Sequence, residues 1–233
     1  ELYQVKEYYR VRYTLDRIYL LKFDRTMEAL FDIGLTSVKK SELKLGISKD
    51  TDLDIVTSSD GNKICFERER ALWYYNLETN SAVKVFSFVE EKADYIRDAY
   101  DQHDIRILNM DEEGNVDFIV YGYMNRGDYE GRVAIVLYKF YAAEARIKEQ
   151  VYIPLETTYQ ILKENLNEFS YVNHKGNFYF TLNNVIYSYN IIARRLETVV
   201  ENISNENLLM LKESKSIAWT NSSEPKKAKN ITV

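Results

Sequence analysis

A histidine lies between two acidic residues in the segment Asp101-Gln102-His103-Asp104. A neighbouring carboxylate can orient an imidazole as a general base, an arrangement that hydrolases use. No Ser or Cys nucleophile stands at a known spacing from this histidine, and the pattern G-x-S-x-G is absent from the sequence. We therefore expect Asp101, His103 and Asp104 to bind a ligand, and we assign no catalytic residue.

A second polar segment, Asn125-Arg126-Gly127-Asp128, is predicted to join two strands. It contains the tripeptide Arg-Gly-Asp, which cell-adhesion receptors can recognise. A tripeptide also occurs by chance in a chain of this length, and its glycine equally suits a hairpin turn. Loops at the end of a rigid sheet commonly carry function. Asn125, Arg126 and Asp128 are therefore the other residues that we expect to bind a ligand.

The sequence contains no pattern for a metal or a cofactor. The alternating acids of Asp50-Thr51-Asp52-Leu53-Asp54 resemble a Ca²⁺ loop, but Ile55 and Gly61 stand where that loop requires Gly and Glu. Cys65 is the single cysteine and lies in an apolar strand pattern, so it is expected to be a small packing residue. Zinc-protease, phosphate-loop and dinucleotide patterns are absent. We expect no metal and no cofactor.

Charge and hydropathy limit the classes of partner. The net charge of −5, with both signs well mixed, offers no basic field for nucleic acid. No apolar run reaches the roughly 18–20 residues of a transmembrane helix, so no membrane insertion by this segment is expected. The expected partner is a protein or a carbohydrate.

A repeat positions these polar segments. The sequence has 20 Tyr, 10 Phe and 2 Trp, and aromatic side chains favour β-strands. The dipeptide Gly-Asn occurs at Gly61, Gly114 and Gly176, each time before a strand-like run, and it allows the positive φ that a tight hairpin needs. One apolar run precedes each Gly-Asn dipeptide, and three apolar runs follow it. We therefore expect units of four antiparallel strands, a, b, c and d.

Three complete units and two partial units are expected. The complete units have strands at Leu53–Thr57, Lys63–Glu67, Ala71–Asn76 and Ala82–Phe88, then at Ile105–Met110, Val116–Tyr123, Val133–Tyr141 and Arg146–Ile153, then at Glu168–Asn173, Asn177–Leu182, Val185–Asn190 and Leu196–Val200. Before them, Tyr8–Tyr13, Arg17–Phe23 and Glu28–Ile33 are expected as b, c and d, and after them Leu208–Lys212, Ser216–Asn221 and Asn230–Val233 as a, b and c. The connections Val89–Asp104 and Leu155–Asn167 are longer and predict short helices.

Four short antiparallel strands per unit are typical of the blade of a β-propeller. The prediction is an all-β, β-propeller-like fold of repeated four-stranded antiparallel blades, about three complete plus two partial, with minor helix in the connections. The aromatic run Trp73-Tyr74-Tyr75 fits this fold, because both faces of a stacked blade are covered. A meander or sandwich with irregular strand pairing is the alternative. We expect residues 1–233 to form a single domain and, since the chain ends within a strand, to be a fragment of a longer chain.

Three short runs carry a resemblance: Tyr100-Asp101-Gln102-His103-Asp104-Ile105, Gly122-Tyr123-Met124-Asn125-Arg126-Gly127 and Ile217-Ala218-Trp219. In these runs, and mainly over residues 60–233, the sequence resembles uncharacterised proteins of Gram-positive, clostridia-like bacteria. Those proteins are large and have a membrane anchor with a propeller-like region outside it. The resemblance implies the extracytoplasmic part of a membrane-anchored bacterial protein, and it implies no reaction and no ligand-binding residues.

These observations favour a non-catalytic binding, interaction or scaffold module of a bacterial surface-associated protein. Recognition would take place through Tyr, Asn and Arg side chains of the loops at one end of the blades. The alternative is a hydrolase that acts on a carbohydrate or a peptide, with acid/base residues around Asp101–Asp104. A third interpretation is a purely structural segment.

Overall fold

The structure is a computed structural model, and it describes residues 3–29, 34, 37–39, 42–44, 54–89, 94–173, 175–211, 216–221 and 224–232. The chain divides into two compact units, Glu1–Leu53 and Asp54–Val233. The larger unit contains the three predicted complete repeats and both polar segments.

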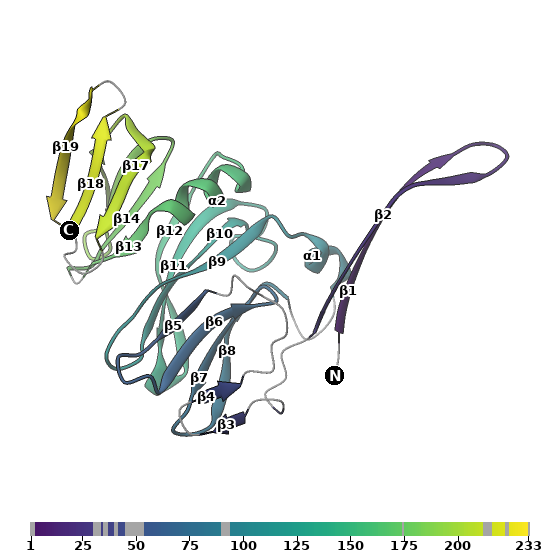
Figure 1. The fold of residues 1–233 in the computed structure, drawn as a ribbon, viewed down its shortest axis with the longest axis horizontal. Helices are drawn as coiled ribbons and strands as arrows, with labels where there is room; N and C mark the ends of the chain where they lie inside the picture. The colour runs from purple at the N-terminus through teal and green to yellow at the C-terminus, as the bar shows by residue number, and fades with distance from the viewer. Residues whose placement is uncertain are drawn as a thin grey trace. The chain divides into compact units, whose positions relative to one another are not determined.

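The larger unit is built from consecutive antiparallel sheets in which each strand pairs with the next along the chain (Figure 1). Blade 1 consists of β5 (Ile55–Thr57), β6 (Lys63–Arg68), β7 (Ala71–Asn76) and β8 (Ser81–Ser87). Blade 2 consists of β9 (His103–Met110), β10 (Val116–Tyr123), β11 (Val133–Tyr141) and β12 (Arg146–Pro154). Blade 3 consists of β13 (Ser170–Val172), β14 (Asn177–Leu182), β15 (Val185–Asn190) and β16 (Arg195–Val200), and β17 (Ile203–Leu211), β18 (Ser216–Asn221) and β19 (Glu224–Thr232) form a three-stranded sheet after it. The all-β, propeller-like arrangement of four-stranded antiparallel blades is confirmed.

The predicted Gly-Asn turns join strands a and b. In blade 2, Gly114 has a φ of +84°, its amide donates to the Asp111 carbonyl at 3.0 Å, and the Asp111 carboxylate accepts from the amide of Asn115 at 2.7 Å. In blade 3, the side chain of Asn173 accepts in the same way from the amide of Asn177 at 2.9 Å. The short side chain before each turn thus satisfies a backbone donor that the hairpin leaves free.

Both faces of blade 2 are buried. One face contributes Val116 and Phe118 to a core shared with blade 1, and the other contributes Ile119 and Tyr121 to a core shared with blade 3. Cys65 belongs to the first core and is fully buried, as a packing residue is expected to be. The alternation of side chains along each strand therefore stacks the blades through two apolar layers.

The two long connections between blades carry the helices. α1 (Tyr95–Ala99) lies between β8 and β9, and α2 (Tyr159–Glu168) lies between β12 and β13, as predicted. The side chains of Asp94 and Thr158 cap α1 and α2 by accepting backbone bonds in the first turn. A 3₁₀ turn, η2 (Ala142–Glu144), follows β11. Among the described residues, no helix has the length and apolar character needed to cross a membrane.

The smaller unit differs in detail from the predicted partial blade. β1 (Tyr3–Tyr13) and β2 (Ile18–Ala29) form one long hairpin, drawn in purple in Figure 1, and β3 (Ser37–Lys39) and β4 (Glu42–Lys44) form a short second one. The prediction placed separate strands c and d at Arg17–Phe23 and Glu28–Ile33. This is corrected, because β2 runs without interruption through residues 24–27, which pair with β1. Residues 30–33 of the predicted strand d lie outside the described residues.

Candidate ligand-binding site

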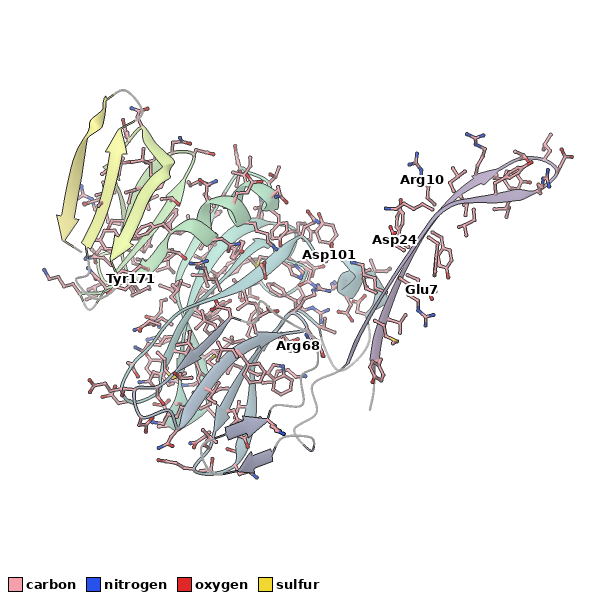
Figure 2. The ribbon with its side chains drawn as sticks, in the orientation of Figure 1. Glu7, Arg10, Asp24, Arg68, Asp101 and Tyr171 are labelled. Atoms are coloured by element: carbon pink, nitrogen blue, oxygen red, sulfur yellow. The ribbon has the colours of Figure 1, made fainter. Side chains whose placement is uncertain are left out.

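Antiparallel strand order places two kinds of connection at the same end of each blade. The chain reverses at every turn, so the b–c and d–a connections share one end and the a–b and c–d turns share the other. The first of these ends carries the turn Glu69-Arg70, the connection with α1, residues Asp101–Asp104 and the loop 124–132. Both predicted polar segments therefore lie at this end, where Figure 2 labels Asp101 and Arg68.

Arg70 is the centre of the contacts at this end. It lies in a two-residue turn with φ of +55° at Glu69 and +60° at Arg70, which is the geometry of a type I′ hairpin. Its Nη1 and Nη2 donate to the carbonyl oxygens of Asp98 and Tyr100, each at 2.6 Å, and its Nε donates to Nε2 of His103 at 3.2 Å. One side chain from blade 1 thus holds both the end of α1 and the first residue of β9.

His103 is buried, and both of its ring nitrogens are engaged. Nδ1 lies 3.0 Å from the carbonyl oxygen of Tyr123, which can only accept, so Nε2 carries the lone pair that accepts from Arg70. The ring stacks on Phe88 at a centroid distance of 3.6 Å. Burial, and then the positive charge of Arg70, lower the pKa of His103 to about 4. The imidazole is therefore neutral at pH 7 with its lone pair already used, which argues against a role as general base.

Asn125 and Arg126 fasten α1 to blade 2. Nδ2 of the buried Asn125 donates to the carbonyl oxygens of Phe88 and Arg97, both at 3.0 Å. Arg126 forms a charge-assisted hydrogen bond with Asp98 on α1 through its Nη2. Both side chains are thus directed at protein groups, and they join the loop 124–132 to the helix.

Arg97 adds contacts between α1 and the loop 124–132 at the surface. Its Nε and Nη2 donate to the two carboxylate oxygens of Glu130 at 2.8 and 3.2 Å, and its Nη1 donates to Asp94 at 2.7 Å. Hydrogen bonds to Glu130 and then to Asp94 raise the pKa of Arg97. The two-pronged pairing with Glu130 adds directional specificity to the contact between α1 and the loop. Arg70 and Arg126 from outside the helix, and Arg97 on it, together connect this helix of five residues to its surroundings.

The connection that contains α1 exposes apolar and aromatic side chains to solvent. Ile96 on α1 is 87% exposed, and Tyr100, which ends the helix, is 44% exposed. The ring of Tyr100 lies 4.2 Å from the ring of Tyr123 at the end of β10. We call Ile96, Tyr100 and Tyr123 the α1 platform. Tyr100 and Tyr123 are neighbouring aromatic rings, and aromatic side chains are enriched at binding surfaces.

Asp104 belongs to a separate polar cluster beside α2. Its Oδ2 lies 3.1 Å from Nζ of Lys163, 3.4 Å from the Tyr159 hydroxyl and 3.5 Å from the Tyr121 hydroxyl. Burial, and then the charge of Asp104, raise the pKa of Glu67 on β6 to about 7. Two carboxyl groups, an ammonium group and two phenols therefore meet here. No group of three metal-ligating side chains is found in the part of the chain that the structure describes.

The six predicted residues thus divide into three sets. His103, Asn125 and Arg126 come together around α1, Asp104 lies in the cluster beside α2, and Asp101 and Asp128 are exposed. The charge of Asp101 acts on Arg70 across the start of β9. His174, the second histidine, lies outside the described residues.

Sequence reasoning missed Arg70, Glu67 and Lys163. Arg70 lies in a turn that contains neither Gly nor Asn, so it resembles an ordinary solvated turn residue. Its contacts with Asp98 and His103 bridge 28 and 33 residues. The one available signal was the short gap between the predicted strands b and c of blade 1, which places Arg70 at the same end as Asp101.

Comparison with known proteins finds fold similarity only. No protein-family model matches the sequence, and no curated protein matches it. The structure is similar to dipeptidyl peptidase 4 of Porphyromonas gingivalis (8% identity, 78% of this chain and 31% of that chain, TM-score 0.43). It is also similar to the WD40 domain of SCAP from fission yeast (10%, 82% and 45%, TM-score 0.46) and to TolB from Acinetobacter baumannii (13%, 76% and 40%, TM-score 0.40). The chain spans less than half the length of each of these chains.

Proposed function

We propose that the chain is a non-catalytic binding module whose partner docks on the α1 platform. The observation that carries the proposal is the 87% exposure of Ile96 on a helix that three arginines hold in place. A helix of five residues has little stability of its own, so its order depends on these contacts. An exposed isoleucine contributes almost nothing to folding. Holding it rigid instead lowers the entropy cost of binding.

A protein partner suits this surface better than a carbohydrate. The rings of Tyr100 and Tyr123 are inclined at 42°, so they do not form the flat face on which a sugar ring would stack. Ile96 offers a protruding aliphatic group that can fill an apolar pocket in a partner. The pair Arg97–Glu130 lies beside it and supplies charges of both signs for a polar rim.

The hydrolase alternative has one observation in its favour. The pKa of Glu67 is raised to about 7, as suits a general acid, and Asp104 lies close enough to contribute to that rise. Both carboxyl groups are however engaged by the protein, since Glu67 accepts from the amide of Arg70 at 3.1 Å and Asp104 binds Lys163. Hydrolysis of chromogenic glycosides and peptides that is lost in both Glu67→Gln and Asp104→Asn would favour this alternative over the binding module.

We propose an extracytoplasmic location in a membrane-anchored bacterial protein as the setting of this module. The resemblance of residues 100–105, 122–127 and 217–219 to such proteins of Gram-positive bacteria supports it. Protease accessibility of the parent protein on intact cells tests it, because a module outside the membrane is digested without lysis.

Three variants test the docking surface. Ile96→Ser and Tyr100→Ala remove groups of the α1 platform, and Ile192→Ser is the matched control. Ile192 is 85% exposed in the turn after β15, a c–d turn at the opposite end of the blades. The probes are a phage-displayed random peptide library and an array of bacterial cell-wall glycans, each screened with the wild-type chain.

The expected result is a set of peptides whose binding weakens at least about tenfold in Ile96→Ser and in Tyr100→Ala, as for central interface residues, and is unchanged in Ile192→Ser. Binding of glycans alone, with the same pattern of loss, would keep the site but replace the protein partner by a carbohydrate. Peptides and glycans that bind all three variants as they bind wild type would refute the docking surface.

A further inference from the structure

The β1–β2 hairpin has one polar face and one apolar face. Side chains alternate between the faces along each strand, and the register pairs apolar residues with each other across the hairpin. The apolar face carries Tyr3, Val5, Tyr9, Val11, Tyr13, Ile18, Leu20, Phe23 and Met27, which are 43–73% exposed. The opposite face carries mostly polar residues, Lys6, Arg10, Arg12, Lys22, Asp24 and Thr26, with Tyr8 and Tyr19 among them, and Figure 2 labels Arg10 and Asp24 on the hairpin. We call the first set the apolar hairpin face.

We propose that a second copy of this chain covers the apolar hairpin face. The two hairpins would pack face to face about a two-fold axis that runs along the strands. A hairpin of two strands is at best marginally stable in water, and it gains stability when its apolar face is packed against another element. A closed, two-fold symmetric pair is the commonest arrangement for a chain that covers its own surface.

The register of the hairpin makes this face self-complementary. A two-fold axis along the strands places each residue of β1 over the β2 residue that it already pairs with in its own copy. Tyr9 then lies over Phe23 of the second copy, and Val5 lies over Met27. Each contact occurs twice by symmetry, so the match holds along the whole hairpin.

The charges on the apolar hairpin face favour a second copy over a lipid surface or a purely apolar partner. Glu7 and Arg25 are paired on this face at 3.4 Å, and the Tyr9 hydroxyl donates to Glu7 at 2.6 Å. The proposed axis places Glu7 of each copy over Arg25 of the other, which forms a ring of four alternating charges. A lipid surface or a purely apolar partner would desolvate the same pair without adding a partner to either charge, which is costly.

The area is large enough for a stable dimer. The exposed fractions of the nine apolar side chains sum to about five whole side chains, which at about 200 Å² each, the middle of the range for aromatic side chains, sets an upper bound of roughly 1,000 Å² per copy. A typical stable interface needs about 800 Å² from each partner. The proposed interface uses no residue of the α1 platform, so it stands independently of the proposed function.

Sedimentation equilibrium of the 233-residue chain is the first test, with Tyr9→Ala and Tyr8→Ala as a matched pair. Tyr9 is 55% exposed on the apolar hairpin face, and Tyr8 is 54% exposed on the polar face. We expect a dimer whose dissociation constant rises by about tenfold or more in Tyr9→Ala, as for a central aromatic interface residue, and stays within about twofold in Tyr8→Ala. A monomeric wild-type chain, or equal effects of the two substitutions, overturns the proposal.

Mixing two charge variants is the second test, and a rescue in the mixture also shows that both variants fold. Glu7→Arg leaves two arginines on the face, and Arg25→Glu leaves two glutamates, so each variant alone should be monomeric. Mixed in equal amounts, they should form a heterodimer in which every arginine faces a glutamate of the other copy. An interaction confined within one copy cannot produce this rescue. A mixture that remains monomeric overturns the proposal.

Discussion

Replacing His103 by Gln tests the contacts around α1 through their pH dependence. The pKa of His103 is lowered to about 4, first by burial and then by Arg70, whereas an unperturbed histidine has a pKa of about 6.5. Between these values the unfolded chain binds a proton that the folded chain does not. The free energy of unfolding therefore falls as the pH falls from about 6.5 to about 4, and the contribution is complete above about pH 6.5.

The expected size follows from the distance between the two pKa values. At about 1.36 kcal/mol per pH unit, crossing the whole window costs about 3 kcal/mol, of which about 2 kcal/mol is lost between about pH 8 and about pH 5. His103 is 3% exposed, so solvent does not screen this contribution appreciably. Gln cannot titrate, and its amide supplies one donor group and one acceptor, as the neutral imidazole does. At about pH 8 we expect His103→Gln to have a lower free energy of unfolding than wild type. This difference should become smaller by about 2 kcal/mol at about pH 5, because only wild type loses stability there.

Two carboxyl groups contribute to the free energy of unfolding with a pH dependence opposite to that of His103. The effect of His103 is therefore seen only in the difference between the variant and wild type. Burial is the first cause that raises the pKa of Glu67 to about 7 and that of Asp117 to about 6. Each keeps a proton in the folded chain that the unfolded chain releases, so each contribution to stability is present at low pH and is lost as the pH rises. In the wild-type curve these contributions oppose that of His103. They cancel in the difference between His103→Gln and wild type.

Urea unfolding followed by tryptophan fluorescence, repeated between about pH 5 and about pH 8, measures this difference. A titration of the histidine ring signals by NMR measures the pKa directly, and His174→Gln assigns the signal because the chain has only two histidines. A His103 pKa near 6.5 would refute the burial of a neutral imidazole against Arg70. A constant stability difference across the pH range would refute it equally.

Two further substitutions test the same end of the blades. In Gly122→Ala, a Cβ would lie 2.5 Å from the Gln102 carbonyl oxygen at a φ of +105°, so we expect a loss of about 3 kcal/mol or more in urea unfolding. Gly61→Ala, with a φ of +72° and open space around it, should cost only about 1 kcal/mol, and equal losses would contradict the close approach. In Glu67→Gln, the free energy of unfolding relative to wild type should rise by about 2–3 kcal/mol between about pH 5 and about pH 8, because the wild-type carboxyl must ionise while folded. A relative stability that falls over this range would contradict the raised pKa.

The blades could be predicted from the sequence because the features that define them are local. Residues 71–76 form a strand of apolar and aromatic residues, and Gly61 and Gly114 end tight turns that reverse the chain. Each strand then pairs with its neighbour in sequence, which requires no knowledge of distant segments. The extent of β2 could not be predicted in this way. It continues through residues 24–27 because β1 offers partners there, and register depends on both strands.

The site could be predicted only by position. His103 and Asn125 stood out as polar residues at one end of blade 2, but the sequence did not indicate that both side chains are buried. Their burial depends on Phe88, which stacks on His103 and accepts a hydrogen bond from Asn125, and on Arg70 from another blade. These residues meet only when blades 1 and 2 stack, and no local pattern predicts that packing.

Strand geometry explains why the polar contacts gather at this end of the blades. Neighbouring strands lie about 4.8 Å apart, and turns of two residues such as Glu69-Arg70 and Asn183-Asn184 can join them. A connection from strand d to strand a of the next blade must span a longer distance. β9 lies against β5 and β6, so the chain must return from β8 across about three strand spacings, or about 14 Å.

Two residues at about 3.3 Å each cannot close that distance, so additional chain is unavoidable here, and α1 and α2 are part of it. This additional chain is free to vary in sequence because the sheets do not depend on it, but it must be immobilised before it can bind a partner with little loss of entropy. Arg70 meets that need, since it reaches from a turn of fixed geometry to the carbonyl groups at the end of α1. We propose that the binding surface lies next to these contacts, at Ile96 and Tyr100.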